Sequence, residues 1–155
     1  MSSPNGFAGA KLPSDKLKMN VEYIRNVFAD DDTLQFRYLS NPFDDRLHFC
    51  LIFADGMINN KLMNDDIVSP LLHYKFPEKI DDLMEQILQH VMLSNSVQKT
   101  ADMEEIVQAL VYGDTVLLAE GCSDTLILNT KGWTVRAITE PESERVIRGP
   151  REGFN

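Results

Sequence analysis

Hydrophobic residues recur at helical spacing in the first part of the chain. Steps of four, three and four residues separate Leu17, Val21, Ile24 and Phe28. This spacing places the four side chains on one face of a helix. Ser14 precedes this face and is a suitable N-cap, and Asp15 in the first turn suits the positive end of the helix dipole. Residues 30–32 are all aspartate, and we expect the helix to end there.

Three more helical segments are predicted in series in the middle of the chain. Residues 58–74 carry a broken apolar face, which predicts either one interrupted helix or two short ones. Residues 77–93 have the most regular apolar stripe, and Pro77 is suited to the first turn. A third helix is expected to begin after Thr100 as its N-cap and to stop at Gly113.

Other stretches follow the pattern of β-strands. Residues 34–39 alternate between apolar and polar positions, which is typical of a strand with one buried face. Residues 47–54 are apolar almost throughout, so we expect a central strand covered on both faces, closed by a turn at Asp55-Gly56. Three later strands are expected at residues 115–119, 125–129 and 134–139. Their connections, EGCSD and TKGW, are typical of hairpins.

These elements predict an α/β or α+β fold. We expect a mixed β-sheet covered by about four helices, in the order α-β-β-α-α-α-β-β-β. Residues 1–13 are rich in Ser, Gly, Ala and Pro without an apolar period, and we expect them to form a flexible lead.

Composition narrows the class of protein. The formal net charge is −9, with 24 acidic against 15 Lys and Arg residues, which argues against nucleic-acid binding through phosphate neutralisation. The two cysteines accompany no secretion signal, and we expect reduced thiols in a cytosolic setting. No apolar run approaches the ~20 residues that a membrane-spanning helix needs, so the chain as given is expected to be soluble.

The candidate catalytic and metal-binding residues do not have the spacing of a known catalytic or metal-binding motif. The three histidines, His48, His73 and His90, lack a ligand partner at metal-binding spacing. Cys50 lies within an apolar strand, where we expect a core thiol rather than a nucleophile. The acidic run at 30–32 lacks the alternating ligands of a calcium loop, and no glycine-rich phosphate loop occurs. The sequence therefore predicts no catalytic, metal or cofactor site and no enzymatic activity.

The last residues form a distinctive cluster. Arginines recur every third position, at Arg145, Arg148 and Arg151, around Gly149-Pro150 and Gly153. Such arginines can bind an anionic ligand or pair with the preceding glutamates. They can also belong to a turn at a domain junction, where they lie on the surface.

Four segments resemble a known family: FADGMINN (53–60), VYGDTVLLAEG (111–121), WTVRAITEP (133–141) and ERVIRGPREGF (144–154). Together they closely resemble the A subunits of GerA-type spore germinant receptors. The RGPREGF motif is the most specific part. The resemblance extends from about Leu17 to the last residue.

The resemblance implies a soluble N-terminal region on the cytoplasmic side of the spore inner membrane, followed by membrane-spanning helices. It implies partnership with a transporter-like B subunit, a lipoprotein C subunit and other A subunits. Such a receptor senses nutrients and triggers the release of ions and dipicolinate. The resemblance implies no enzymatic activity for this region, and contact with the membrane only through the part of the subunit that follows.

The family's N-terminal region has two α/β subdomains. On that basis we expect residues 14–140 to form the first subdomain, and residues 141–155 to form a hinge and the truncated start of the second. The hinge and interaction candidates are Arg145, Arg148, Gly149, Pro150, Arg151 and Gly153. The chain stops just past this motif, which indicates a shortened form or a partial gene product. We therefore expect Arg148 and Arg151 to be poorly ordered or to take contacts from a neighbouring molecule.

Two functions from different classes fit these observations. The first is a non-enzymatic signalling and interaction module that couples nutrient sensing elsewhere in the receptor to assembly or gating. The alternative is a nutrient-binding sensor whose cleft lies between this subdomain and the second one, with arginines holding a carboxylate. An unrelated metabolic enzyme is a third option, but the sequence offers no residues for its active site.

Overall fold

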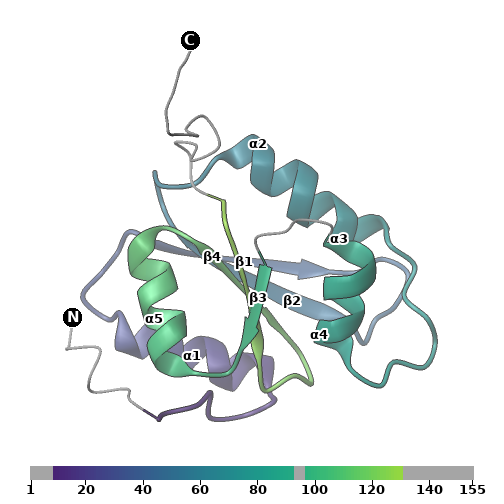
Figure 1. Ribbon diagram of the computed structural model, residues 1–155, viewed down its shortest axis with the longest axis horizontal. Coiled ribbons are helices and arrows are strands. Elements are labelled where there is room, and N and C mark those ends of the chain that lie inside the picture. Colours follow the sequence, from purple (N-terminus) through teal and green to yellow (C-terminus); the bar gives the residue numbers. More distant parts are fainter. Residues whose placement is uncertain (1–8, 93–96, 131–155) are drawn as a thin grey trace, which may run out of the picture.

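The central feature of the fold is a five-stranded antiparallel sheet in the order β1-β2-β4-β5-β3. The computed structural model describes residues 9–92 and 97–130. The strands are β1 (Leu34–Ser40), β2 (His48–Ala54), β3 (Val97–Thr100), β4 (Thr115–Ala119) and β5 (Thr125–Leu128). Helices cover both faces of this sheet, which gives three layers (Figure 1).

Alternating side chains of the central strands supply two separate cores. Cys50 and Ile52 of β2 face the core under α1 (Leu17–Val27) and α5 (Met103–Tyr112). Phe49 and Leu51 face the opposite core, which is covered by the remaining helices. All four side chains are at most 1% exposed. The expectation of a central strand covered on both faces is confirmed.

The second face is covered by two helical units. One runs without a break from α2 (Asn60–Met63) through a π-helical turn, η2 (Asn64–Val68), into α3 (Ser69–His73). It is thus one helix with an internal irregularity. The other unit joins α4 (Leu83–Gln86) to a second π-helical turn, η3 (Ile87–Val91).

Three expected helix starts were wrong, and in each case a different residue provides the start. Asp82 caps α4 by accepting a hydrogen bond from Glu85 N–H at 3.2 Å, so the helix begins well after Pro77. Asp102, instead of Thr100, caps α5 through Glu104 N–H at 3.0 Å. Ser14 accepts a hydrogen bond from Lys16 N–H, but Lys16 itself occupies the N-cap of α1.

The end of α5 follows the sequence expectation. Gly113 adopts φ 98°, a left-handed conformation that glycine reaches without the steric cost of a Cβ. Its N–H donates to Leu110 O at 3.2 Å, and Asp114 N–H donates to Ala109 O at 2.9 Å. These bonds satisfy carbonyls of the last helical turn and send the chain into β4.

The expected fold class is confirmed, while the sheet differs from expectation in two respects. Every pairing among the described strands is antiparallel, whereas a mixed sheet was expected. The short strand β3 precedes α5, so the order over the described residues is α-β-β-α-α-β-α-β-β. The expected strand at 134–139 and the hinge lie outside the described residues.

β5 occupies an internal position in the sheet. Leu128 pairs with Thr115 of β4 on one side and with Val97 of β3 on the other. The expected β4–β5 hairpin through EGCSD is confirmed. The second expected hairpin, through TKGW, extends into residues outside those described, so it stays a prediction.

Candidate functional site at the loop end of the sheet

A cleft of about 420 Å³ opens where three loops meet at one end of the sheet. We call it the loop-end cleft. Its walls come from the loop before β2, the segment before α4 and the β4–β5 turn. The lining residues used below are Arg46, Asp82, Glu120, Cys122 and Asp124.

Acidic groups and one lysine form an ion-pair cluster beside the loop-end cleft. Lys99 Nζ of β3 lies 2.8 Å from Glu85 Oε2 and 3.4 Å from Asp82 Oδ2. These carboxylates raise the pKa of Lys99, so the ammonium stays charged. Partial burial raises the pKa of Asp124, and the nearby Lys99 opposes that shift without cancelling it. The lining of the cleft contains four acidic residues, Asp81, Asp82, Glu120 and Asp124, and one basic residue, Arg46, while Lys99 lies beside it.

Cys122 places a thiol in the lining of the cleft. Burial, together with the negative charges of Asp124 and Asp82, raises its pKa to about 12. The reactive form of cysteine is the thiolate, which needs an electropositive environment. At neutral pH the Cys122 thiol is therefore protonated, and the cleft is suited to recognition by polar contacts instead of nucleophilic chemistry.

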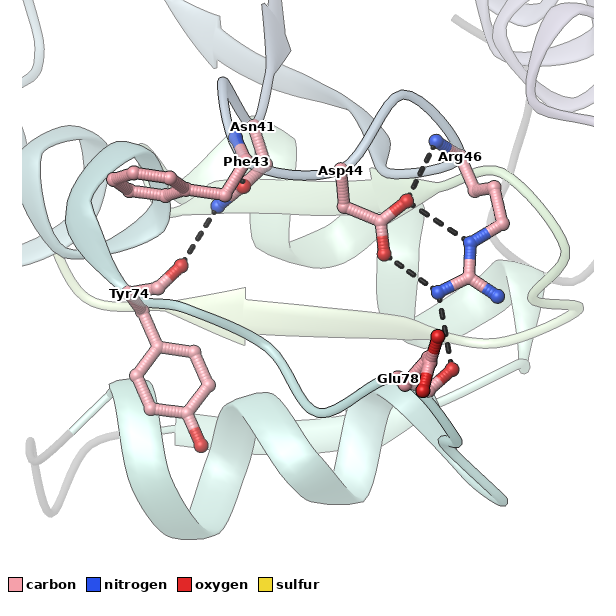
Figure 2. A network of polar contacts seen from close by, with 6 residues as sticks. All are labelled: Asn41, Phe43, Asp44, Arg46, Tyr74 and Glu78. Carbon is pink, nitrogen blue, oxygen red and sulfur yellow. Dashed lines mark hydrogen bonds and ion pairs between the residues drawn. The ribbon is translucent and has the colours of Figure 1, made fainter.

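Arg46 is held in place at the mouth of the cleft. Its Nε and Nη2 donate to Asp44 Oδ1 and Oδ2 at 2.9 and 2.6 Å, and Nη2 also donates to Glu78 O at 3.1 Å (Figure 2). The Arg46 hydrogen bonds lower the pKa of Asp44 to about 2. This bidentate pair fixes the guanidinium against the segment that leads to α4.

The same loop is anchored by a buried asparagine. Asn41 is 2% exposed, and its Nδ2 donates to Leu71 O at 2.8 Å and to Tyr74 O at 2.9 Å. Its Oδ1 accepts from Phe43 N–H at 2.9 Å. Figure 2 shows Asn41 reaching from the β1–β2 loop to the end of α3. Asn41 thereby connects the β1–β2 loop, which carries Arg46, to the end of α3.

The cysteine and histidines considered as catalytic or metal-binding candidates do not come together in one site. Cys50 lies in the core with a pKa raised to about 12 by burial, which confirms the expected core thiol. His48 Nδ1 lies 2.9 Å from Ser40 Oγ in an exposed cross-strand pair, and His73 Nδ1 contacts Ser69. His90 is exposed near the end of η3.

The Ser40–His48 pair and the loop-end cleft were both missed from sequence. A catalytic Ser–His pair needs a third group that orients the imidazole, and no carboxylate contact to His48 is seen within the described residues. No group of three or more His, Cys, Asp or Glu residues is placed to hold a metal ion in that part of the chain. The EGCSD turn was the available signal for the cleft, because all five of its residues line it.

The Arg145–Arg151 cluster and its glycines and proline lie outside the described residues, so their expected role stays a prediction. Over residues 9–92 and 97–130, no helix combines the length and apolarity that crossing a membrane requires.

Comparison with known proteins identifies the family of this chain. A profile of the Bacillus/Clostridium GerA spore germination protein family matches residues 22–155. The chain belongs to the GerA family. Its sequence is 31% identical over 144 residues to spore germination protein B1 of Bacillus subtilis (strain 168), covering 93% of this chain and 29% of that protein. It is 32% identical over 141 residues to the uncharacterized membrane protein YfkQ of the same strain, covering 91% of this chain and 27% of YfkQ.

A solved structure supports the fold of this GerA family member. The N-terminal domain of the A subunit of the Bacillus megaterium spore germinant receptor GerK3 superposes with a TM-score of 0.66 at 16% sequence identity. The match covers 79% of this chain and 49% of that domain. This chain therefore spans less than a third of the two curated relatives and about half of the GerK3 domain.

Proposed function

We propose that this chain acts in spore germination as the soluble N-terminal portion of a germinant receptor A subunit. The observation that carries the proposal is the family match over residues 22–155, combined with the fold of the GerK3 N-terminal domain. Its role is that of a non-enzymatic signalling and interaction module. The helices on both faces of the sheet provide surfaces for contact with other parts of the receptor.

The proposed partners are a transporter-like B subunit, a lipoprotein C subunit and other A subunits. The proposed location is the cytoplasmic side of the spore inner membrane, to which the remaining part of the subunit would anchor this region. Relatives named as spore germination proteins and a membrane protein support this assignment. The protonated state of Cys122 supports a role without covalent catalysis.

The test uses spores that depend on the complete A subunit. Deleting residues 9–130 should abolish nutrient-triggered dipicolinate release and co-purification of the B subunit, while the membrane portion still accumulates. Cys122→Ser is the matched control, because the proposal assigns no bond-forming chemistry to this thiol. Normal germination after the deletion, or its loss in Cys122→Ser at normal subunit levels, would contradict the proposal.

A second candidate function is a nutrient-binding sensor. Two observations favour it: the GerK3 protein is named a germinant receptor, and the loop-end cleft falls within the roughly 300–1,000 Å³ range of small-molecule sites. Calorimetric titration with amino acids and sugars separates the two functions. A sensor with a shared cleft binds only when the second subdomain is present, whereas an interaction module gives no binding heat with or without it.

A further inference from the structure

The two edges of the sheet differ in their protection against pairing with a further strand. β3, at one edge, has four residues, and its Lys99 is held by ion pairs to Asp82 and Glu85. β1, at the other edge, has seven residues and pairs with β2 along its whole length without a bulge. Its single charged residue, Arg37, is hydrogen-bonded to Asn64 of η2. Short strands, lysines and bulges are the usual protection of a sheet edge, and β1 lacks all three.

The backbone of β1 presents a row of unused hydrogen-bonding groups. Just outside its two ends, Thr33 O accepts from Asp55 N–H at 2.7 Å and Asn41 N–H donates to Leu47 O at 3.0 Å. Because hydrogen-bonded pairs alternate along an antiparallel ladder, the odd-numbered residues direct N–H and C=O toward β2 and the even-numbered residues direct theirs away. The outward residues are Leu34, Phe36, Tyr38 and Ser40. Over residues 9–92 and 97–130, these outward N–H and C=O groups have no hydrogen-bonding partner.

A pocket of about 380 Å³ lies beside this edge, between β1 and the end of α1. We call it the α1–β1 pocket. Phe28, Leu34 and Phe36 contribute apolar side chains to its lining, and Asp31 and Asp32 contribute carboxylates. Directly opposite residues of paired strands point their side chains to the same face of a sheet. A strand added along β1 would therefore direct alternate side chains toward this pocket.

The charges around the α1–β1 pocket favour a basic occupant. Arg25 Cζ lies 4.1 Å from the centre of the Phe36 ring, and Arg25 Nε lies 3.7 Å from Glu22 Oε2, so this cation is already engaged. Asp32 is exposed, and its carboxylate forms no hydrogen bond or ion pair with any residue that the structure describes. It belongs to the aspartate run at 30–32, in a chain of net charge −9. A lysine or arginine at this end of β1 would meet uncompensated negative charge.

We propose that the free edge of β1, together with the α1–β1 pocket, binds an extended basic and apolar segment of another protein as an additional strand. The segment runs antiparallel to β1, as in every described pairing of this sheet. It places apolar side chains opposite Tyr38, which is 58% exposed, Phe36 and Leu34, and it ends in Lys or Arg opposite Asp32. Backbone hydrogen bonds supply affinity, and the pocket supplies selectivity. The inference rests on the geometry of this edge and is independent of the proposed role in germination.

A synthetic peptide tests strand addition on the intact chain. The probe is fluorescein-labelled SVTVTVSRK, whose valines are placed to pair with Tyr38, Phe36 and Leu34 and whose arginine is placed opposite Asp32. We expect saturable binding in fluorescence anisotropy. N-methylation of the three valines should weaken binding by about tenfold, because it removes the N–H groups that face β1. N-methylation of the two threonines is the matched control and should change affinity by less than about twofold, because their N–H groups point away from β1.

Variants of Tyr38 test the same hydrogen bonds from the side of the protein. Tyr38→Pro removes an outward N–H without removing a bond to β2, and proline is tolerated at such a position of an edge strand. It should weaken peptide binding by about tenfold. Tyr38→Ala keeps the N–H and should weaken binding by at most about threefold, through loss of the aromatic contact.

A second pair of variants tests the charge contribution. Asp32→Lys should weaken binding of the basic peptide by about fivefold. Asp81→Lys is the matched control, because it changes the net charge equally at an exposed residue of the loop-end cleft. It should change affinity by less than about twofold. Far-UV circular dichroism confirms that each variant is folded, and the N-methylated peptides need no variant.

Four outcomes would overturn the proposal. The first is the absence of saturable binding up to about 1 mM peptide. The second is an equal effect of valine and threonine N-methylation, which would mean that no strand is added. The third is an equal effect of Asp81→Lys and Asp32→Lys, which would mean that the peptide does not depend on the charge beside β1. The fourth is a dimer of the chain that Tyr38→Pro dissociates, which would assign the edge to a second copy.

Discussion

Glu120 caps a helix that lies 103 residues earlier in the chain. Its Oε1 accepts a hydrogen bond from the backbone N–H of Leu17, the first residue of α1, at 3.1 Å. Lys16 at the N-cap offers no side-chain acceptor to the helix. The adjacent Gly121 N–H donates to Asp15 O at 2.8 Å. The β4–β5 turn thus supplies the negative charge and the acceptor that the start of α1 lacks in its own sequence.

Removing this acceptor should destabilise the protein. We expect Glu120→Ala to lower the free energy of unfolding by about 1 kcal/mol, the usual cost of losing a helix N-cap. Glu120→Gln should cost less, because its amide oxygen can still accept the hydrogen bond although the charge is lost. Urea unfolding followed by circular dichroism measures both. Equal effects of the two substitutions would show that charge, and not the hydrogen bond, stabilises α1.

The buried Asn41 should be sensitive to truncation. Asn41→Ala leaves the carbonyls of Leu71 and Tyr74 without their amide donor, and we expect a loss of about 1–3 kcal/mol. Asp45→Ala, an exposed change in the same loop, should stay within about 0.5 kcal/mol of the parent. Thermal and urea unfolding provide the comparison. A small effect of Asn41→Ala would mean that water replaces the side chain.

Gly113 and Gly121 form a matched pair for testing backbone strain. Both have positive φ angles, 98° and 89°, so alanine at either position should cost about 1–2 kcal/mol. A Cβ at Gly113 would also lie 2.8 Å from Cε of Met57, whereas a Cβ at Gly121 meets nothing within 4 Å. We therefore expect Gly113→Ala to be the more destabilising of the two. In a Met57→Ala background this difference should disappear, and a persistent difference in unfolding free energy would assign it to another cause.

The two thiols should react slowly in the folded protein. With a pKa of about 12, Cys50 and Cys122 each have a thiolate fraction at pH 8 roughly a thousandfold below that of an unperturbed thiol. Ellman's reagent should therefore label both rapidly only after unfolding in guanidinium.

The Asp124→Asn variant provides the control for the electrostatic contribution. Asp124 raises the pKa of Cys122, so neutralising it should lower that pKa and speed labelling of Cys122. Labelling of Cys50 should not change, because burial alone raises its pKa. Mass spectrometry of each labelled cysteine distinguishes the two sites. Equal acceleration at both would indicate a general loosening of the fold.

The fold class could be predicted because long apolar patterns dominate it. The run from Phe49 to Ala54 faces both cores of the sheet, the stripe around Met84 and Ile87 faces one of them, and both were expected to be buried. The antiparallel pairing of non-consecutive strands could not be predicted, since it depends on how distant segments meet. The strand β3 was missed because VQKT is short and mostly polar, which is usual for an edge strand.

Helix starts were the least predictable part, for a physical reason. Pro77 and Thr100 are suitable first residues by type, but tertiary contacts decide which candidate is used. Thr100 pairs with Thr125 in the sheet, so Asp102 caps α5. The loop-end cleft was missed for the same reason, because three segments far apart in the sequence form it together.

The internal position of β5 has a consequence for synthesis of the protein. Among the described strands, β3 pairs only with β5, although β3 precedes it by more than twenty residues. A nascent chain therefore holds β3 without a partner until Thr125–Leu128 has left the ribosome. Until then the sheet is incomplete, and apolar side chains of both cores remain exposed to solvent.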